Sequence, residues 1–476
     1  MSLFLLLLRQ AGPAVFLAAC HLVYPIPGWA DGLRLKTAAS LAQGGAEGPR
    51  VSESGASTPG AKQQSVAPFL SHLALRAAEY QPTILAADAS RRADSERVEQ
   101  ARGALRPQVS GVLGAQREFA DSGATQAFTG LSGGVRLALP LYRPQSDAAI
   151  NVAEAQLRST EFAQAETRRD VLARVVDTYL LAAFFEEEAE LLQAERALLL
   201  RQRAINERRV TGGIGTRVEV IETAARADAV QSLVSGSQGN YRQQLAELER
   251  LSAVPVSGVR RVRSGEPDVL VPPTVAAALV QGRERNATLS RLSAALATAR
   301  ETVTLQRGGA RPAVDLVGNV DQARNHFNPG TVSAPSTAIG VQLTVPLWTG
   351  GVIESRVREA MARVERAEAD LRDAELSLQS DLAKAYADLE RARAQWLTQR
   401  GVLEIANQAM EATTKAFDAG VRSNIDLLNS QQFVFSARRE ELRVRVAILA
   451  AQARILALVQ GLAPEMLVRL DGAFGG

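Results

Sequence analysis

The sequence predicts an α+β membrane protein in which long coiled-coil helices are joined to the strands of a transmembrane β-barrel shared by three identical chains. Three observations support this fold class. Landmarks in the first half of the chain recur in order in the second half. Apolar residues follow a heptad spacing over about six repeats. Four segments of about ten residues alternate apolar with polar positions.

The composition is typical of long helices and excludes several classes of protein. The chain has 476 residues, with 54 Lys and Arg against 51 Asp and Glu, so neither a basic nucleic-acid surface nor an acidic tail is expected. Apolar residues make up 46% and aromatic residues only 5%, which favours helices over a compact core. One Cys and three scattered His argue against a disulfide framework and a metal site, and no cofactor is expected.

Residues 1–30 have the layout of an export signal peptide, with apolar stretches around Arg9 and small residues before a cleavage point after Ala30. Two alternatives stay open. One is a transmembrane anchor, which the prolines of this segment disfavour, and the other is a lipobox-like Leu-Ala-Ala-Cys that would place a lipid on Cys20. Residues 31–67 are rich in Gly, Ala, Ser and Gln, and we interpret them as a flexible linker. No transmembrane helix is expected after Ala30.

The remainder of the chain contains two tandem copies of one module. Its landmarks recur at offsets that drift only from 205 to 207 residues, which chance similarity between Ala-rich helices does not explain. We assign residues 68–270 to the first repeat, 271–463 to the second and 464–476 to a C-terminal tail. The recurring landmarks are Arg106-Pro107 and Arg311-Pro312, segments 137–142 and 343–348, Tyr179 and Tyr386, and Gly213 and Gly420.

Each repeat is expected to contain one very long helix, from Val352 to about Phe417 in the second and from about Gln145 to Val210 in the first. At 1.5 Å per residue such a helix is about 100 Å long. The apolar seam of the second helix, interrupted at Asp381, has the heptad spacing of coiled-coil packing. Its members are Ile353, Val357, Ala360, Val364, Ala367, Leu371, Ala374, Leu378, Ala385, Leu389, Ala392 and Trp396.

Four strands are predicted at about 107–119, 131–141, 312–320 and 338–347. In the last, Ile339, Val341 and Leu343 alternate with smaller or polar residues, and each strand has about the length that crosses a bilayer. Strands of a soluble sheet are the alternative, but four strands separated by coiled coils would make a poor one. In lipid an open sheet edge is not tolerated. Three chains supply twelve strands, the smallest closure expected to leave an aqueous bore, so a homotrimer is favoured.

Several motifs of this sequence resemble the TolC-type outer membrane factors, the exit ducts of bacterial efflux and type I secretion, over about residues 69–462. The family's Pro between helix and strand fits A-L-R-P-Q-V at 104–109 and G-A-R-P-A-V at 309–314. Its strand exit fits P-L-W-T-G-G at 346–351, whereas P-L-Y-R-P-Q at 140–145 lacks the glycines. The helix-to-barrel transitions are thus Pro107, Pro140, Pro312, Pro346, Gly350 and Gly351.

The family's tip motif fits G-V-R-S-N-I-D-L-L at 420–428 and, more loosely, G-I-G-T-R-V-E-V-I at 213–221. The resemblance implies a periplasmic tunnel of twelve helices, closed at its inner tip by turns at 211–216 and 418–423. The turn residues expected to contact partner proteins are Gly213, Gly215, Thr216, Gly420 and Ser423.

By the same resemblance, Arg422 and Glu219 would link adjacent tip helices and hold the entrance shut. Phe417 stands where the family has a Tyr, so that hydroxyl link is missing. Asp426 would form an anionic ring around the axis, and Asn429 stands at the second ring position. The alternative is that Glu219 and Asp426 are ordinary solvated carboxylates in the first turns of helices.

The resemblance implies an outer membrane protein that extends into the periplasm and works with a periplasmic adaptor and an inner membrane ABC transporter or, alternatively, a proton-driven pump. Arg422 followed by I-D-L-L resembles the secretion branch, so type I secretion of a protein such as a large toxin, as in CyaE-like exporters, is favoured over drug or metal efflux. A second alternative is a periplasmic coiled-coil adaptor or scaffold, which two strand pairs disfavour.

No catalytic site is expected. Gly130-Leu131-Ser132-Gly133-Gly134 matches the elbow of serine hydrolases, but that motif needs a helix after it and here an alternating strand follows. Ser132 is therefore interpreted as a pore-facing strand residue. Tyr179 and Tyr386, which occupy equivalent positions of the two long helices, are interpreted as packing anchors.

Overall fold

The computed structural model describes residues 68–118, 128–327 and 330–475, which belong to one compact unit. The predicted signal peptide, Cys20, the linker at 31–67 and the loops around Gly123 and Asn328 lie outside the described residues.

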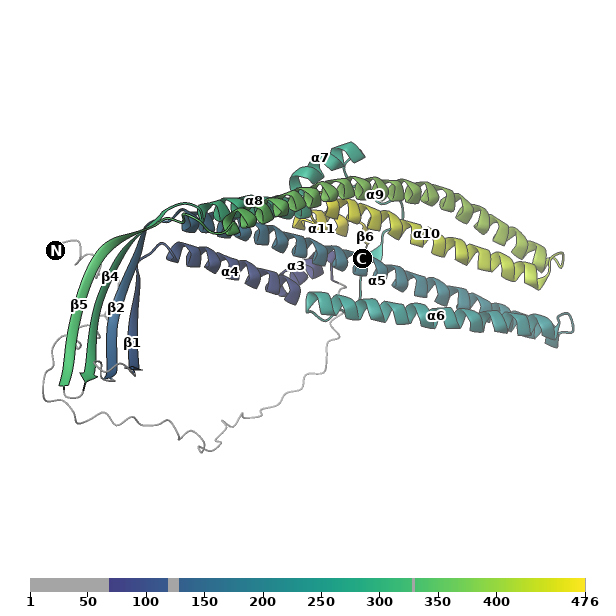
Figure 1. Ribbon diagram of the computed structural model, residues 1–476. Coiled ribbons are helices and arrows are strands. Elements are labelled where there is room, and N and C mark those ends of the chain that lie inside the picture. Colours follow the sequence, from purple (N-terminus) through teal and green to yellow (C-terminus); the bar gives the residue numbers. More distant parts are fainter. Residues whose placement is uncertain (1–67, 119–127, 328–329, 476) are drawn as a thin grey trace, which may run out of the picture. The chain divides into compact units, whose positions relative to one another are not determined.

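The described chain contains the same six long elements in the same order twice, which confirms the tandem repeat (Figure 1). The first set is α3 (Leu70–Tyr80), α4 (Pro82–Gly103), β1 (Gln108–Glu118), β2 (Phe128–Tyr142), α5 (Pro144–Thr211) and α6 (Arg217–Ser252). The second is α7 (Val275–Arg285), α8 (Ala287–Gly308), β4 (Ala313–Phe327), β5 (Gly330–Thr344), α9 (Val352–Asp418) and α10 (Asn424–Val459).

The two long helices begin and end within one residue of the predicted bounds, and the residues at their starts explain why. Pro144 occupies the first turn of α5, where its missing N–H costs nothing. Gly350 and Gly351 adopt positive φ of 62° and 83° directly before α9, a backbone that favours glycine. The predicted seam of α9 is confirmed, because all twelve of its residues are buried or half-buried.

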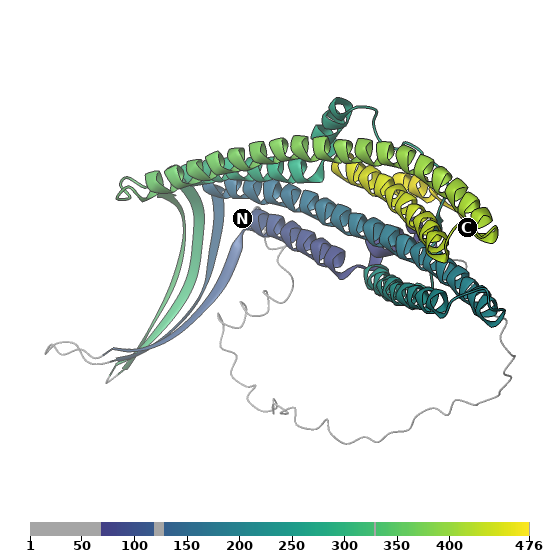
Figure 2. The same ribbon diagram turned by 90° about the vertical axis from the view of Figure 1, so that its right-hand side faces the viewer.

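The helices lie side by side along the length of α5, and Figure 2 shows them from a second side. Nearer the strands, α5 packs between α4 and α8, and α8 packs against α9. Towards the other end, α5 packs between α6 and α10, and α10 packs against α9. Within the described residues, no helix combines the length and apolarity required to cross a bilayer.

The four long strands form one antiparallel sheet in the order β1-β2-β4-β5, so β1 and β5 are its edges. Two predicted strands need correction. β4 and β5 both span 15 residues and extend through polar segments in which apolar alternation gives no signal. β5 also ends at Thr344, not at 347, two residues before Pro346, which has no N–H to donate to a ladder.

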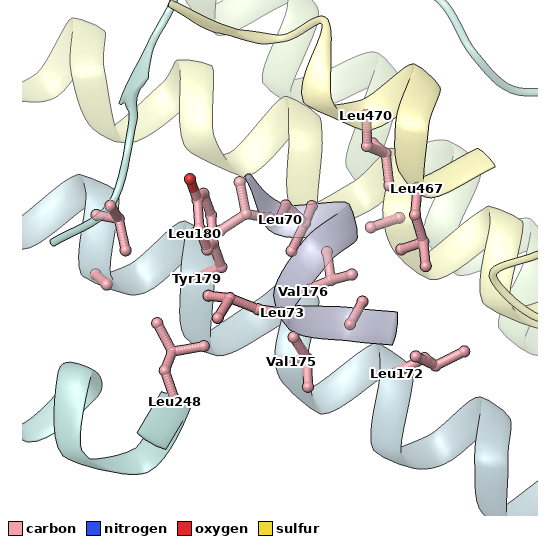
Figure 3. Close-up of a cluster of buried hydrophobic side chains, with 14 of the residues drawn as sticks. Leu70, Leu73, Leu172, Val175, Val176, Tyr179, Leu180, Leu248, Leu467 and Leu470 are labelled. Carbon is pink, nitrogen blue, oxygen red and sulfur yellow. The ribbon is translucent and has the colours of Figure 1, made fainter. Parts of the chain in front are cut away.

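The segment predicted as a C-terminal tail, residues 464–476, is part of the core. It forms α11 (Pro464–Asp471) and β6 (Phe474–Gly475), and β6 pairs with the short strand β3 (Arg261–Val262). Leu467 and Leu470 are buried beside the start of α3 (Figure 3), and Asp471 accepts the Ser71 N–H at 3.3 Å. The sequence did not reveal this because the segment is short and its partners lie up to 400 residues away.

The two equivalent tyrosines anchor the long helices in the core, as predicted. The Tyr179 hydroxyl donates to the Pro68 carbonyl at 3.1 Å and accepts the Arg260 N–H at 2.9 Å. The Tyr386 hydroxyl donates to the Pro272 carbonyl at 2.8 Å. Each hydroxyl thus ties a long helix to a proline shortly before the first helix of its own repeat. Burial raises the pKa of Tyr179 to about 12, and leucines surround its ring (Figure 3).

We expect Tyr179→Phe to lower the free energy of unfolding by about 1–3 kcal/mol, because two half-buried backbone groups lose the hydroxyl as a partner. Tyr386→Phe breaks one such bond and should cost about 1 kcal/mol. Tyr80, which is half exposed, supplies the control Tyr80→Phe. Thermal unfolding in detergent should rank the midpoints wild type and Tyr80→Phe first, then Tyr386→Phe, then Tyr179→Phe. Equal midpoints for all four proteins would contradict the anchor role.

Candidate functional site

One face of the four-stranded sheet is apolar, and none of the described residues covers it. The register places Val135 opposite Val320, Leu316 opposite Val341, and Val314 opposite Leu343. Water does not favour a continuous apolar sheet face, so this face requires a partner or an apolar medium. Its exposed large side chains are Val109, Leu113, Leu131, Val135, Val320, Ile339, Val341 and Leu343.

The opposite face of the sheet is polar. It carries Ser132, whose hydroxyl is 3.4 Å from the Gly114 carbonyl, and Arg136, Asn319 and Asp321 occupy the same face by register. Asn319 donates to Asp321. Ser132 lies inside β2 with a neighbouring strand on each side, so the hydrolase elbow is not formed. The sheet is therefore two-sided, with apolar and polar residues separated by the alternation of the strands.

The predicted transition residues lie between helices and strands. Pro107 and Pro312 directly precede β1 and β4, and Pro140 lies at the bulge of β2. Here the Arg143 guanidinium donates to the Asp315 carboxylate at 2.7 Å, and the Asp315 side chain is only 13% exposed. This ion pair joins the start of the first long helix to a strand of the second repeat.

The two tip turns lie at the far ends of α5 and α9 from the sheet. Gly213 and Gly420 adopt positive φ of 79° and 76°. Gly215 lies so close to the chain that an added Cβ would be 2.9 Å from the Arg209 Cβ. Gly213 and Gly420 thus require glycine because of their positive φ, and Gly215 requires it because no space remains for a side chain.

Reciprocal capping boxes start the helices after both turns. The Thr216 hydroxyl accepts the Glu219 N–H, and the Ser423 hydroxyl accepts the Asp426 N–H, while each carboxylate accepts its cap's N–H. The hydroxyl and N–H of Ser423 hold the pKa of Asp426 below its usual value. Glu219 and Asp426 therefore both have a local role in helix capping.

The predicted gate residues are not all brought together within one chain. The Arg422 guanidinium lies 4.0 Å from Asp426, and both side chains are exposed. Among the described residues of a single chain, no ion pair joins Arg422 to Glu219. Asn429 instead accepts a hydrogen bond from the Arg226 guanidinium at 2.8 Å, which links α10 to α6.

Phe417 is buried between helices. Its ring lies 4.6 Å from the Arg209 guanidinium, a cation–π contact between α9 and α5. The Tyr-to-Phe difference therefore leaves a packing contact at this position instead of a hydroxyl link.

A buried polar network just above the tips escaped the sequence analysis. Asn206 on α5, Thr223 on α6 and Asn424 on α10 are at most 3% exposed. The Asn206 amide donates to Asn424 at 3.0 Å and to Thr223 at 3.1 Å. One signal was present, because Thr223 occupies a seam position four residues before Ala227 on α6, where an apolar residue is usual.

A second buried link between the hairpins lies further along the helices. The Arg439 guanidinium of α10 donates to Glu195 of α5 at 2.6 Å. Burial raises the pKa of Glu195, and the hydrogen bond from Arg439 opposes this rise. Within the described residues, no group of three or more His, Cys, Asp or Glu is placed to hold a metal ion.

Comparisons with known proteins agree with this architecture. The family model described as outer membrane efflux protein matches residues 73–254 and 278–460, once per repeat and over more than half of the chain. The solved structure of CusC superposes with a TM-score of 0.73, at 14% identity, over 85% of this chain and 95% of CusC.

Three curated relatives are similar in sequence. The alkaline protease secretion protein AprF of Pseudomonas aeruginosa is 28% identical over 64% of this chain and 64% of its own length. The outer membrane protein TolC of Vibrio cholerae is 25% identical over 76% and 84%, and the protein CyaE of Bordetella pertussis is 28% identical over 65% and 65%. The matches thus span slightly less than two thirds of AprF and CyaE.

The doubled helix–strand pattern, the two-sided sheet and the duplicate family match lead to one assignment. The chain belongs to the outer membrane efflux protein family, whose members are channels that lie in the outer membrane and extend into the periplasm.

Proposed function

We propose that this protein is the outer membrane exit duct of a tripartite export system and that three chains assemble it. The observation that supports this most directly is the sheet, in which the described residues leave the apolar face uncovered and the two edges, β1 and β5, without a partner. Lipid would cover the face, but unpaired N–H and C=O groups at the edges find no partner in lipid. Pairing β5 of one chain with β1 of the next removes every edge, and twelve strands enclose a bore lined by the polar face.

The helices support the same head-to-tail arrangement. The lateral order runs α4, α5, α8, α9 near the sheet and α6, α5, α10, α9 near the tips, so α9 forms one border of the chain and α4 and α6 the other. Both borders expose large apolar side chains, as expected for surfaces that meet in an assembly. These are Met361, Leu376, Leu397 and Ile405 on α9, and Leu85, Val218, Ile221 and Leu233 on α4 and α6.

We infer that the cargo is a protein secreted by the type I route. AprF and the Dickeya chrysanthemi protein PrtF are named as protease secretion proteins, and CyaE is similar over a comparable length. The partners would be a periplasmic adaptor at the tip turns and an ABC transporter. The alternative is drug or metal efflux with a proton-driven pump, which the CusC-like fold equally suits. In either case the duct itself performs no catalysis.

The hairpin tips form the periplasmic entrance in this proposal. Arg422 is exposed at the tip and its planar guanidinium suits a carboxylate. Its proposed partner is Glu219 of an adjacent helix in the assembled ring. Asp426, three copies of which surround the axis, would attract cations and repel anions.

The sheet predicts a sharp contrast between two neighbouring substitutions on β5. Leu343 lies on the apolar face and Gln342 on the polar face. Leu343→Arg should impair assembly, because a charge on the lipid-facing side of a barrel costs from about 0–1 kcal/mol at the bilayer interface to about 2–4 kcal/mol at its midplane, whereas Gln342→Arg should be tolerated. The measurement is the yield of heat-modifiable trimer, about three times the 50.8 kDa chain, from outer membranes. A stable monomer with full strand content would contradict the shared barrel.

The proposed topology is checked by labelling on intact cells. Single cysteines introduced at Gly123 and Asn328 should react with an impermeant maleimide, because the loops around them would face the outside. A cysteine at Gly213 should react only after the outer membrane is permeabilised. Labelling of intact cells at Gly213 but not at Asn328 would invert the orientation.

The entrance model separates the roles of the two charged tip residues. Arg422→Ser should raise single-channel conductance in planar bilayers and increase the antibiotic sensitivity of cells, because a helix link is lost. Phe417 in place of Tyr makes the entrance looser already, so we expect a modest rise. Asp426→Ala should leave conductance near wild type while weakening cation selectivity and block by multivalent cations. If Arg422→Ser conducts like wild type and Asp426→Ala keeps full selectivity, both residues act only as solvated helix starts.

A further inference from the structure

The buried polar network above the tips spans both hairpins of one chain. Asn206 belongs to the first long helix, Thr223 to the helix after the first turn, and Asn424 to the helix after the second turn. Asn206 and Asn424 are 218 residues apart in sequence, yet the side-chain amide of Asn206 donates a hydrogen bond to the side-chain oxygen of Asn424 at 3.0 Å. The network thus joins the α5–α6 hairpin to the α9–α10 hairpin.

Every side-chain polar atom of this network has a partner. The Asn206 oxygen accepts from Gln202 at 3.1 Å, and the Thr223 hydroxyl donates to the Glu219 carbonyl at 2.7 Å. The Asn424 amide donates to Thr223 at 3.5 Å. Satisfied amides in a seam specify one arrangement of helices, because any sliding leaves them buried and unpaired.

Glu219, Arg422 and Asp426 do not join the two hairpins within the chain. Glu219 is engaged with Thr216 and Asp426 with Ser423, each inside its own hairpin. Arg422 approaches Asp426 of the same hairpin. The connections between the hairpins at this level are therefore the buried, uncharged network, the Phe417–Arg209 contact and the hydrogen bonds from Arg226 to Asn429 and Gln432.

We propose that Asn206, Thr223 and Asn424 are the internal lock of the entrance: they fasten the two hairpins of each chain in the closed arrangement, and opening requires their hydrogen bonds to be exchanged for bonds to water. This inference rests on the proposed duct function. The lock contains no ionisable group, so neither pH nor salt weakens it directly, in contrast to an ion pair between chains.

A double-mutant cycle on Asn206 and Asn424 tests the lock. Each single variant, Asn206→Ala or Asn424→Ala, should raise the open probability in planar bilayers about tenfold, because the remaining amide is left unpaired in the closed state. The double variant should open about as often as either single variant, since both remove the same bond. The matched control is Asn240→Ala, which changes an exposed asparagine of α6, the helix that carries Thr223. This variant should behave like wild type.

The near-isosteric Asn424→Asp variant adds a readout that a purely structural role would not give. A carboxylate buried in the network opposes closure at neutral pH, and its pKa is raised by burial. The entrance should therefore open at pH 7 and close again as pH falls through that raised pKa, whereas Asn240→Asp shows the wild-type profile. Wild type is the reference for the other ionisable groups of the tip. They include Glu207, Arg208 and Arg209 on α5, Arg217, Glu219, Glu222 and Arg226 on α6, Lys415 and Asp418 on α9, Arg422 in the second turn and Asp426 on α10.

The possible outcomes distinguish a failure of the proposed lock from a failure of the proposed duct function. If wild type forms pores but the Asn206 and Asn424 variants open no more often, or their effects simply add, the lock is overturned and the duct stands. If neither wild type nor any variant, Arg422→Ser included, conducts, the duct function fails and the lock with it. All variants are first checked for heat-modifiable trimer, and the pH reversal of Asn424→Asp excludes misfolding as the cause of opening.

Discussion

The packing of α5 on two sets of neighbours is the constraint on which the rest of the structure depends. Near the sheet its apolar residues are covered by α4 and α8, and towards the tips by α6 and α10. Tyr179 lies where the two sets meet, and its fully buried ring and paired hydroxyl fix the position of α5 against the start of α3 and the segment before β3. One continuous helix carries both sets of contacts. The position of the sheet at one end is therefore fixed relative to the tips at the other end.

At the tips, burial decides which interactions matter. The Arg422–Asp426 pair is exposed and 4.0 Å apart, and such pairs contribute little because solvent screens them. The Asn206–Asn424 bond is buried, and leaving one amide unpaired there costs about 1–3 kcal/mol. At this level the buried, neutral Asn206–Asn424 bond therefore contributes more to the attachment of one hairpin to the other than the exposed Arg422–Asp426 pair. The exposed charges remain free to act between chains or on passing ions.

The two-sided sheet connects the fold to its surroundings. Its apolar face and its unpaired edges present two different problems, and lipid solves only the first. In the proposed duct the second is solved by another copy of the chain, so the duct is an assembly and not a monomer. The same lateral order of helices beneath the sheet lets one pair of borders serve both the strands and the coiled coils.

The sequence alone determined the repeat, the long helices and the strand pairs, because each rests on local periodicity that packing against neighbours must respect. The seam of α9 and the glycines at 213, 350, 351 and 420 are examples in which the residue and its required backbone are read at one position. Tertiary structure alone decided which polar residues meet. Asn429 bonds to Arg226, Asn206 bonds to Asn424, and α11 and β6 enter the core, all through contacts between segments about 200 or more residues apart in sequence. A polar side chain carries no periodic signal of its partner, so only the packed helices reveal whether it is solvated or paired.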